Sequence, residues 1–365
     1  MRSIRNGKVD KVLLFAVLCI SLFGILFVHS ATYDPINYPG QLSPLAVKQC
    51  IWILTGLLIM LLVTKIDFFK ILNISVVLYI LNLLLLVLLF TIGGERFGAR
   101  RWLILGPISL QPSEFVKITF ILVLAAFLGE RRERGGSFSN FFGALFIAFP
   151  AMALIFLQPD LGTALVLIPI LFSMLFICGE NIKYMLAVII AGLSALPVLW
   201  NILRDYQKTR LMVFLNPNLD PLGAGYTIIQ SKIAIGSGGL FGKGWMNGTQ
   251  SYLKFLPERH TDFIFSVIGE ELGFIGAIGL VACYALIFIR GVRILYKSTN
   301  IYERAIAAGV ITLIAFQVFV NLSMTIGIMP VVGLPLPVIS YGGSGTITAL
   351  IGMGLLLNIS KRTSR

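Results

Sequence analysis

Charged residues, cysteine and histidine are scarce in this 365-residue sequence. Asp, Glu, Lys and Arg make up 12% of it, against about a quarter in a typical soluble domain, which excludes a soluble enzyme, a disordered chain and a coiled coil. The four cysteines lie in or beside apolar runs without CxxC spacing, which argues against a disulfide framework and a zinc site. Two histidines are too few for a metal–histidine centre or a Ser-His-Asp arrangement.

Acidic residues are also scarce relative to basic ones, because 16 Asp and Glu stand against 29 Lys and Arg, a net charge of +13. In a soluble protein this excess would suggest a nucleic-acid partner. In a chain with many membrane helices, basic residues gather on the cytoplasmic side and meet anionic lipid there. We therefore expect no nucleic acid.

Apolar residues are abundant, at 57% of the chain with a mean hydropathy of +0.92. A membrane-spanning helix needs about 20 apolar residues, so the length allows many spans but no separate soluble domain. The apolar runs lie at about 12–31, 50–64, 70–93, 114–129, 141–157, 162–179, 184–203, 263–289, 303–328 and 344–360. The sequence predicts an all-α polytopic membrane protein with about ten transmembrane helices in a single transmembrane domain, residues 1–365.

Basic residues also predict the orientation of these helices. Ten spans place both termini on one side, and the short segments on that side hold 17 Lys and Arg, whereas the opposite short segments hold four. The positive-inside rule therefore predicts cytoplasmic termini. The basic start leads into an apolar run without a cleavage-site pattern, so we interpret it as the first membrane helix and not as a cleaved signal.

A large extracytoplasmic loop is predicted between the seventh and eighth helices, over residues 204–262. It holds seven basic and four acidic residues, and its segment TIIQSKIAI is amphipathic, as in helices that lie in a membrane interface. The glycines that follow this segment indicate tight turns or close backbone approach.

Positive charge also gathers where the orientation rule disfavours it. Arg101 is one of three arginines in the short outer segment GGERFGARRW. They can contact lipid headgroups or pair with the adjacent glutamate. The functional alternative is an anionic ligand, such as a phosphate, at the outer face.

Ionisable residues inside predicted spans are costly and are candidates for function. Glu114 and Lys117 are three residues apart and share a helix face, so they form either a salt bridge that fixes packing or a polar site that binds a headgroup or gates a path. Asp160, in FLQPDLGT, either caps the following helix or pairs with Lys117 or an outer arginine.

Asp262 stands where the long loop meets the eighth apolar run, in FLPERHTDFIF. A carboxylate against apolar surface has a raised pKa unless a cation offsets the burial, and a raised pKa suits a general base. Alternatively, Thr261 and Asp262 simply cap the next helix.

A Pro- and Gly-rich outer loop is predicted over residues 327–343, where Pro330, Pro335 and Pro337 forbid a continuous helix. Non-helical backbone at membrane depth must be buried in protein or line a cavity. The loop is therefore either a rigid hairpin that dips into the membrane or a wall of a substrate groove.

Together these motifs resemble the SEDS family of bacterial membrane proteins. The matching stretches are ARRWLILGPISLQPSEFVK, QPDLGT, the run from DPLGAGYTIIQSKIAIGSGGLFGKGW to FLPERHTDFIFSVIGEELG, and PVVGLPLPVISYGGSG, from about residue 97 to 346. The segment GTQS with FLPERHTDFIF favours the branch that serves cell elongation and rod shape over the division branch. The first 90 residues or so match only in hydropathy.

The resemblance implies a peptidoglycan glycosyltransferase that polymerises lipid II at the outer face of the bacterial cytoplasmic (inner) membrane. Asp262 matches the family's essential acidic residue, Glu114 and Lys117 its intramembrane polar pair, and Asp160 its second acidic position. The implied partners are a class B penicillin-binding protein, which is a transpeptidase, and other proteins of the elongation complex.

The residues fit that chemistry. One carboxylate, Asp262, would take the proton of the acceptor hydroxyl, and a single inverting displacement needs no second carboxylate as nucleophile. Outer cations would neutralise the departing undecaprenyl pyrophosphate. The candidates are Arg101, Lys243 and Arg259, with Arg210 and Lys232 as further ones. A divalent cation (Mg²⁺ or Mn²⁺) could share this role, but no ligand cluster in the sequence requires one, so we predict no metal site.

Two other functions stay open at this point. A lipid II flippase would use the intramembrane Glu114 and Lys117 as part of a polar path, although the sequence shows no internal repeat. A non-catalytic scaffold that activates the penicillin-binding protein would tolerate replacement of Asp262.

Overall fold

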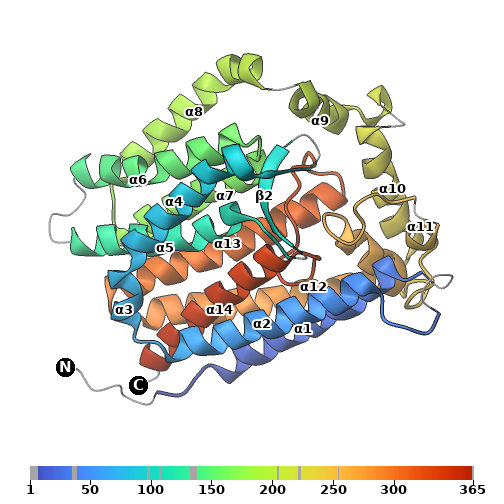
Figure 1. The fold of residues 1–365 in the computed structure, drawn as a ribbon, viewed down its shortest axis with the longest axis horizontal. Helices are drawn as coiled ribbons and strands as arrows, with labels where there is room; N and C mark the ends of the chain where they lie inside the picture. Colours follow the sequence, from blue (N-terminus) through green and yellow to red (C-terminus); the bar gives the residue numbers. More distant parts are fainter. Residues whose placement is uncertain are drawn as a thin grey trace.

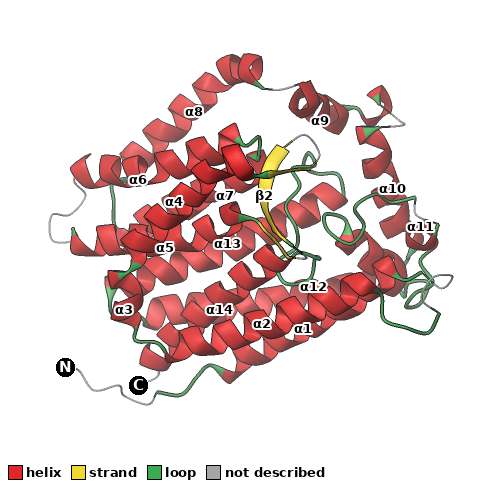
Figure 2. Ribbon diagram, in the orientation of Figure 1, coloured by secondary structure: helices red, strands yellow, loops and turns green. Residues whose placement is uncertain are grey.

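The computed structural model describes residues 7–34, 39–96, 99–106, 108–131, 138–203, 205–220, 223–253 and 255–363. Long helices dominate it, and they run side by side in one bundle (Figures 1 and 2). Figure 1 shows the start of α1 and the end of α14 at one end of the bundle, with the shorter helices α9 to α11 away from them. The described part of the chain is therefore a helical bundle with its termini together.

Each predicted apolar run is helical, although the run at 70–93 is divided between two helices. The long helices are α1 (Lys11–Thr32), α2 (Pro44–Lys65), α4 (Ser75–Ile92), α5 (Pro112–Glu130), α6 (Phe138–Leu157), α7 (Leu161–Cys178), α8 (Ile182–Ile202), α12 (Ile264–Lys297), α13 (Ile301–Thr325) and α14 (Gly343–Thr363). Nine of these are long and apolar enough to cross a membrane, and α8 covers the tenth predicted run with a shorter apolar stretch, Ile182–Ala195. The all-α polytopic membrane fold is confirmed, and the short α3 (Phe68–Asn73) precedes α4 as a separate helix.

Burial is greatest in α5, α13 and α14, which lie in the middle of the bundle (Figure 1). α14 packs against α2, and α13 packs against α7 and α5. Figure 1 shows α8 along one edge and α1 and α2 along the opposite edge. The polar residues of α5 thus lie in the protein interior rather than against lipid.

A small antiparallel sheet follows α4, which the all-α prediction did not include. Its strands are β1 (Gly94–Arg96), β2 (Ala99–Leu105) and β3 (Ile108–Leu110), in the order β1-β2-β3. Hydropathy detects runs long enough to span a membrane, and these short strands lie in the connection between two spans. The sheet carries Arg101 toward the turn between α6 and α7.

The long loop, residues 204–262, contains α9 (Asp205–Leu215), the short 3-10 helix η2 (Pro217–Leu219), α10 (Ala224–Ser237) and α11 (Thr249–Tyr252). The amphipathic segment TIIQSKIAI lies within α10, which packs against α12. Ser231 Oγ lies 2.7 Å from Ser266 Oγ of α12 and donates to Thr325 O at 2.6 Å. The segment is therefore docked on the bundle by buried polar contacts.

α12 is broken at Gly273, whose φ of 64° and ψ of −159° are not helical. A break in a membrane helix leaves carbonyls before it and amides after it without partners. Four backbone hydrogen bonds with the glycine-rich loop provide the missing partners. The loop donates from Lys243 N to Glu270 O at 3.0 Å and from Gly244 N to Glu271 O at 2.9 Å. The helix donates from Phe274 N to Gly239 O at 2.9 Å and from Ile275 N to Leu240 O at 3.2 Å. Residues 239–244 therefore complete the hydrogen bonding of the broken helix.

The Pro- and Gly-rich loop, residues 327–343, folds into the protein. Leu334, Leu336 and Ile339 are buried. The amide of Gln49 in α2 donates to Val338 O at 3.3 Å and Ser340 O at 3.2 Å. Its non-helical backbone thus finds partners inside the protein, as backbone at membrane depth must.

Candidate active site

Asp262 lies just before α12, against the loop of residues 327–343. Its backbone carbonyl accepts a hydrogen bond of 3.0 Å from Asn321 Nδ2, and the same amide donates to Leu334 O at 2.8 Å. A Cβ placed on Gly333 would lie 3.5 Å from Asp262 Oδ2. Asn321 therefore ties the backbone at Asp262 to the loop, and the Asp262 carboxylate lies against the loop at Gly333.

The surroundings of Asp262 raise its pKa to about 6. Burial is the largest cause, because it disfavours the charged form. The carboxylates of Glu258 and Asp160 raise the pKa further, and the guanidinium of Arg210 opposes them. Asp262 thus has a pKa of about 6, with two further carboxylates and a cation within electrostatic range.

Arg210 reaches this point from α9. Its Nη1 donates to Val331 O at 3.2 Å, and its side chain is exposed. Val331 and Gly333 lie two residues apart in the loop, so the same short piece of backbone contacts both Arg210 and Asp262. The structure therefore brings these two predicted residues together, at a place where the cation is accessible from outside.

Asp160 both caps α7 and pairs with an outer arginine. The cap and the arginine pair, which the sequence left as alternatives, are therefore both present. It accepts from Thr163 N at 3.3 Å and Thr163 Oγ1 at 3.0 Å. Gln111 Nε2 donates to it at 3.1 Å, and Arg101 Nη1 lies 3.8 Å from its Oδ1.

Arg101 has two backbone partners in the turn between α6 and α7. Its Nε donates to Gln158 O at 2.9 Å, and its Nη2 donates to Pro159 O. A guanidinium offers five N–H donors, so these contacts leave others available. Arg101 thus fixes the turn that presents Asp160 while keeping donors for an anion.

Glu114 and Lys117 form the predicted intramembrane pair. Lys117 Nζ lies 2.7 Å from Glu114 Oε1, and Lys117 and Glu114 are 0% and 4% exposed. A Cβ on Gly345 at the start of α14 would lie 3.4 Å from Glu114 Oε2. The pair is buried between α5 and α14, and its contacts in the described structure do not extend to Asp160.

The structure gives the other three predicted cations different neighbours. Lys243 Nζ lies 2.7 Å from Glu270 Oε1 in the buried first part of α12. Arg259 Nε donates to Ala31 O at the end of α1. Lys232 lies beside Gly327, where an added Cβ would meet its Cε at 2.1 Å. Lys243 and Arg259 are therefore engaged in holding loop and helices together.

Three residues near Asp262 and Asp160 were not singled out from the sequence: Gln111, Asn321 and Gly333. Asn321 is a polar residue within an apolar helix, which is a signal that sequence analysis can use. Gly333 meets Asp262 only in the folded chain, and no local sequence pattern shows that contact.

Within the described ranges, no group of three or more His, Cys, Asp or Glu side chains is arranged to hold a metal ion. The divalent cation considered above thus rests on the chemistry of pyrophosphate and not on a set of protein ligands.

Comparison with known proteins places the chain in a family. The family model described as cell cycle protein, for FtsW, RodA and SpoVE, matches residues 10–365. The chain is 41% identical to peptidoglycan glycosyltransferase MrdB of Escherichia coli K12 over 351 residues, covering 96% of this chain and 93% of that protein. It is 37% identical to stage V sporulation protein E of Bacillus subtilis over 356 residues, covering 96% and 97%.

Solved structures agree with this comparison. A chain of a peptidoglycan synthase complex, described as coordinating polymerization and crosslinking, superposes with a TM-score of 0.82 at 32% identity, covering 98% of this chain and 99% of that one. The rod shape determining protein RodA of Thermus thermophilus gives a TM-score of 0.73 at 32% identity, with 98% of both chains covered. Sequence motifs, fold and full-length similarity agree, and the chain belongs to the FtsW/RodA/SpoVE family, the SEDS family of multi-pass membrane proteins.

Proposed function

We propose that this protein is a peptidoglycan glycosyltransferase that polymerises lipid II at the outer face of the bacterial cytoplasmic membrane, in cell elongation and rod shape. Relatives that match almost the whole chain carry the name peptidoglycan glycosyltransferase. The observation that carries the proposal is that Asp262, whose pKa is raised to about 6, lies against the same loop that the exposed Arg210 contacts.

The proposed reaction is a single displacement at the sugar C1 of one lipid II molecule. Asp262 takes the proton of the acceptor hydroxyl as its oxygen forms a bond to C1, and the bond from C1 to the pyrophosphate breaks. The pyrophosphate leaves with the electron pair. A general base with a pKa near the working pH is suited to this role, and inversion at C1 requires no carboxylate nucleophile.

Cations would neutralise the negative charge that develops on the leaving pyrophosphate. Arg210 is the best placed, because it is exposed and lies in the electrostatic surroundings of Asp262. Arg101 stands beside Asp160 with donors to spare. Lys232 is a further candidate in the same outer region, whereas Lys243 and Arg259 would act by holding the loop in place.

A class B penicillin-binding protein is the partner we propose. The support is the similarity to a chain of a peptidoglycan synthase complex that coordinates polymerization and crosslinking. Glycan strands that are made at the outer face of the cytoplasmic membrane need a transpeptidase on that side to be crosslinked. A divalent cation carried by the pyrophosphate would add positive charge without protein ligands of its own.

The proposal is tested by glycan polymerisation from purified lipid II with the detergent-purified protein, its penicillin-binding partner and blocked transpeptidation. Wild type should make polymer, and Asp262→Asn should make none at equal folding and partner binding. Asp205→Asn, an exposed carboxylate of the same outer loop, is the charge-matched control and should keep activity.

Other outcomes separate the alternatives. Equal polymer from wild type and Asp262→Asn would move the base elsewhere. If neither makes polymer while a control polymerase works, the protein is not the polymerase. A liposome assay for lipid II movement would then distinguish a flippase from a scaffold that only activates its partner.

A further inference from the structure

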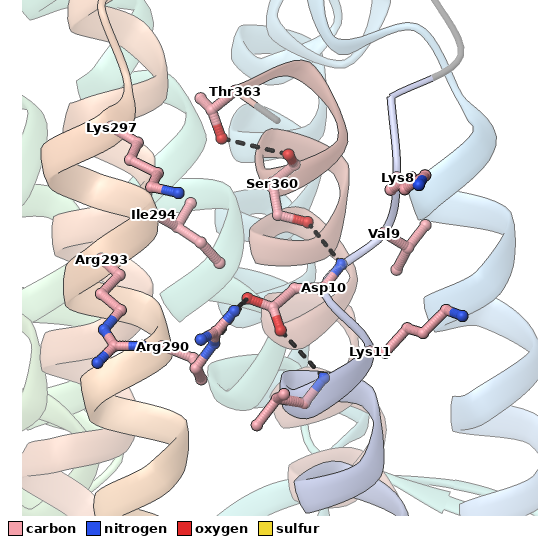
Figure 3. Close-up of a pocket in the computed structure, with 11 residues that line it drawn as sticks. Lys8, Val9, Asp10, Lys11, Arg290, Arg293, Ile294, Lys297, Ser360 and Thr363 are labelled. Atoms are coloured by element: carbon pink, nitrogen blue, oxygen red, sulfur yellow. Dashed lines mark hydrogen bonds and ion pairs between the residues drawn. The ribbon is translucent and has the colours of Figure 1, made fainter. Parts of the chain in front are cut away.

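A concave site lies at the end of the bundle opposite Asp262, where α1 begins and α14 ends. A cavity of about 290 Å³ opens between the start of α1, the last turns of α12 and the end of α14. Figure 3 shows Arg290 beside Asp10, and Lys297 extending toward Ser360 of α14. The site contains none of the residues assigned to polymerisation, so it needs a separate explanation.

The lining of this cavity is strongly basic. It includes five basic residues and one acidic residue, namely Lys8, Lys11, Arg290, Arg293, Lys297 and Asp10. Asp10 is already satisfied, because its Oδ2 lies 2.6 Å from Arg290 Nη2 and its Oδ1 accepts from Val12 N and Leu13 N at 3.1 Å and 3.0 Å. The single anion is thus neutralised, and an excess of positive charge is left.

Three of the cations are open to a ligand. Lys11, Arg293 and Lys297 are exposed, and the structure shows no ion pair for them within the part of the chain it describes. Arg290 uses Nε and Nη2 on Asp10, which leaves further N–H donors of its guanidinium for an anion. Lys297 and Arg290 lie on one wall of the cavity, two turns apart in α12.

Apolar side chains lie among these charges. Val9, Val12 and Ile294 line the same cavity, and the site is where α12 and α14 reach their last residues, Lys297 and Thr363. A free phosphate would gain nothing from the apolar wall. A phospholipid presents an anionic phosphate next to glycerol and acyl carbons, and basic pockets between membrane helices are suited to such headgroups.

We propose that this cavity binds the phosphodiester headgroup of an anionic phospholipid. Arg290, Arg293 and Lys297 hold the phosphate, and Val9 and Ile294 contact the carbons that follow it. The site lies on the side of the membrane that holds the chain termini, where the charge distribution predicts the cytoplasm. It is independent of the polymerisation site at the other end of the bundle.

The test is lipid retention by the full chain, measured by native mass spectrometry from detergent. Phosphatidylglycerol and phosphatidylcholine with the same acyl chains are the probes. Wild type should retain phosphatidylglycerol in preference. The double variant Arg293→Gln/Lys297→Gln should bind it about 25-fold more weakly, because each basic residue near anionic lipid is worth roughly a fivefold change.

A matched control removes the same charge from the same end of the bundle. Lys65 and Lys183 are exposed at the end of α2 and in the first turn of α8, and Lys65→Gln/Lys183→Gln should keep the preference. Lys297→Arg retains a cation and should bind as wild type does, which separates loss of charge from loss of folding.

Three results would overturn the proposal. One is equal retention of both lipids by wild type. Another is an equal loss in the control pair, which would mean that the basic residues act only through the overall charge. The third is displacement of the lipid by inorganic phosphate as effectively as by more phosphatidylglycerol, which would identify a free anion as the ligand.

Discussion

The protonation of Asp262 should set the lower pH limit of activity. Its pKa is raised to about 6, and a general base acts in its deprotonated form. We therefore expect kcat/KM for polymerisation to rise about tenfold per pH unit below this value and to level off above it. Glu258→Gln removes a neighbouring anion that raises this pKa, so the acid limb should move to lower pH.

A pH profile of lipid II polymerisation checks this, with Glu130→Gln, an exposed carboxylate at the end of α5, as the matched control that should leave the profile unchanged. An acid limb that is the same in Glu258→Gln and wild type would show that the limb belongs to another group.

Glu114 and Asp262 should respond in opposite directions when their charge is removed. Glu114→Gln leaves the fully buried Lys117 without its carboxylate, which costs about 3–5 kcal/mol in comparable cases. Asp262 has a folded pKa above its unfolded value, so its ionisation costs stability as pH rises between the two, and Asp262→Asn should stabilise the fold at neutral pH. Unfolding in one detergent measures both.

The double variant Glu114→Gln/Lys117→Met supplies the control for the buried pair. It removes both charges and should be more stable than Glu114→Gln alone, because no unpaired ion is left in the membrane. Equal stability of Glu114→Gln and Asp262→Asn would contradict the pair.

At the scale of an element, the break in α12 should tolerate no side chain. A Cβ on Gly273 would lie 2.3 Å from Gly242 N, and its φ of 64° disfavours any other residue. Gly273→Ala should therefore lower the free energy of unfolding by several kcal/mol or abolish folding, since the loop of residues 239–244 could no longer pack against α12.

Gly279→Ala is the matched control in the same helix. Nothing lies within 4 Å of a Cβ at Gly279, and alanine is the better helix former by about 1 kcal/mol, so this variant should be as stable as wild type or more. Thermal unfolding of the two variants decides the point. Equal melting temperatures would mean that the break does not contribute to stability.

The elements differ in how far their sequence predicts them. Membrane helices follow from apolar composition alone, which is why every predicted run is helical. The break at Gly273 could not be predicted, because Gly276 and Gly279 lie in the same helix and glycine is common in membrane helices. What distinguishes Gly273 is a loop some 30 residues earlier in the chain, and hydropathy does not detect such a partner.

At the scale of the whole molecule, the candidate site was predicted in part. The sequence indicated Asp262 through its place at a membrane edge and Asp160 through its place at a helix start. The cations of the site were harder to predict, because the position of a basic side chain on a loop depends on how the loop folds. Arg210 contacts Val331 in the loop beside Asp262, whereas Lys243 pairs with Glu270. Basic residues that look equivalent in the sequence therefore differ in their tertiary contacts, and those contacts determine which of them lies near Asp262.

The two ends of the bundle should face opposite sides of the membrane, because the proposed polymerisation site belongs at the outer face and the basic cavity at the cytoplasmic face. Asn247, in the long loop, and Thr299, between α12 and α13, are both exposed. In a chain whose four cysteines are replaced, Asn247→Cys should react with a membrane-impermeant maleimide on intact spheroplasts. Thr299→Cys should react only after permeabilisation. The reverse pattern would place Asp262 in the cytoplasm and exclude polymerisation at the outer face.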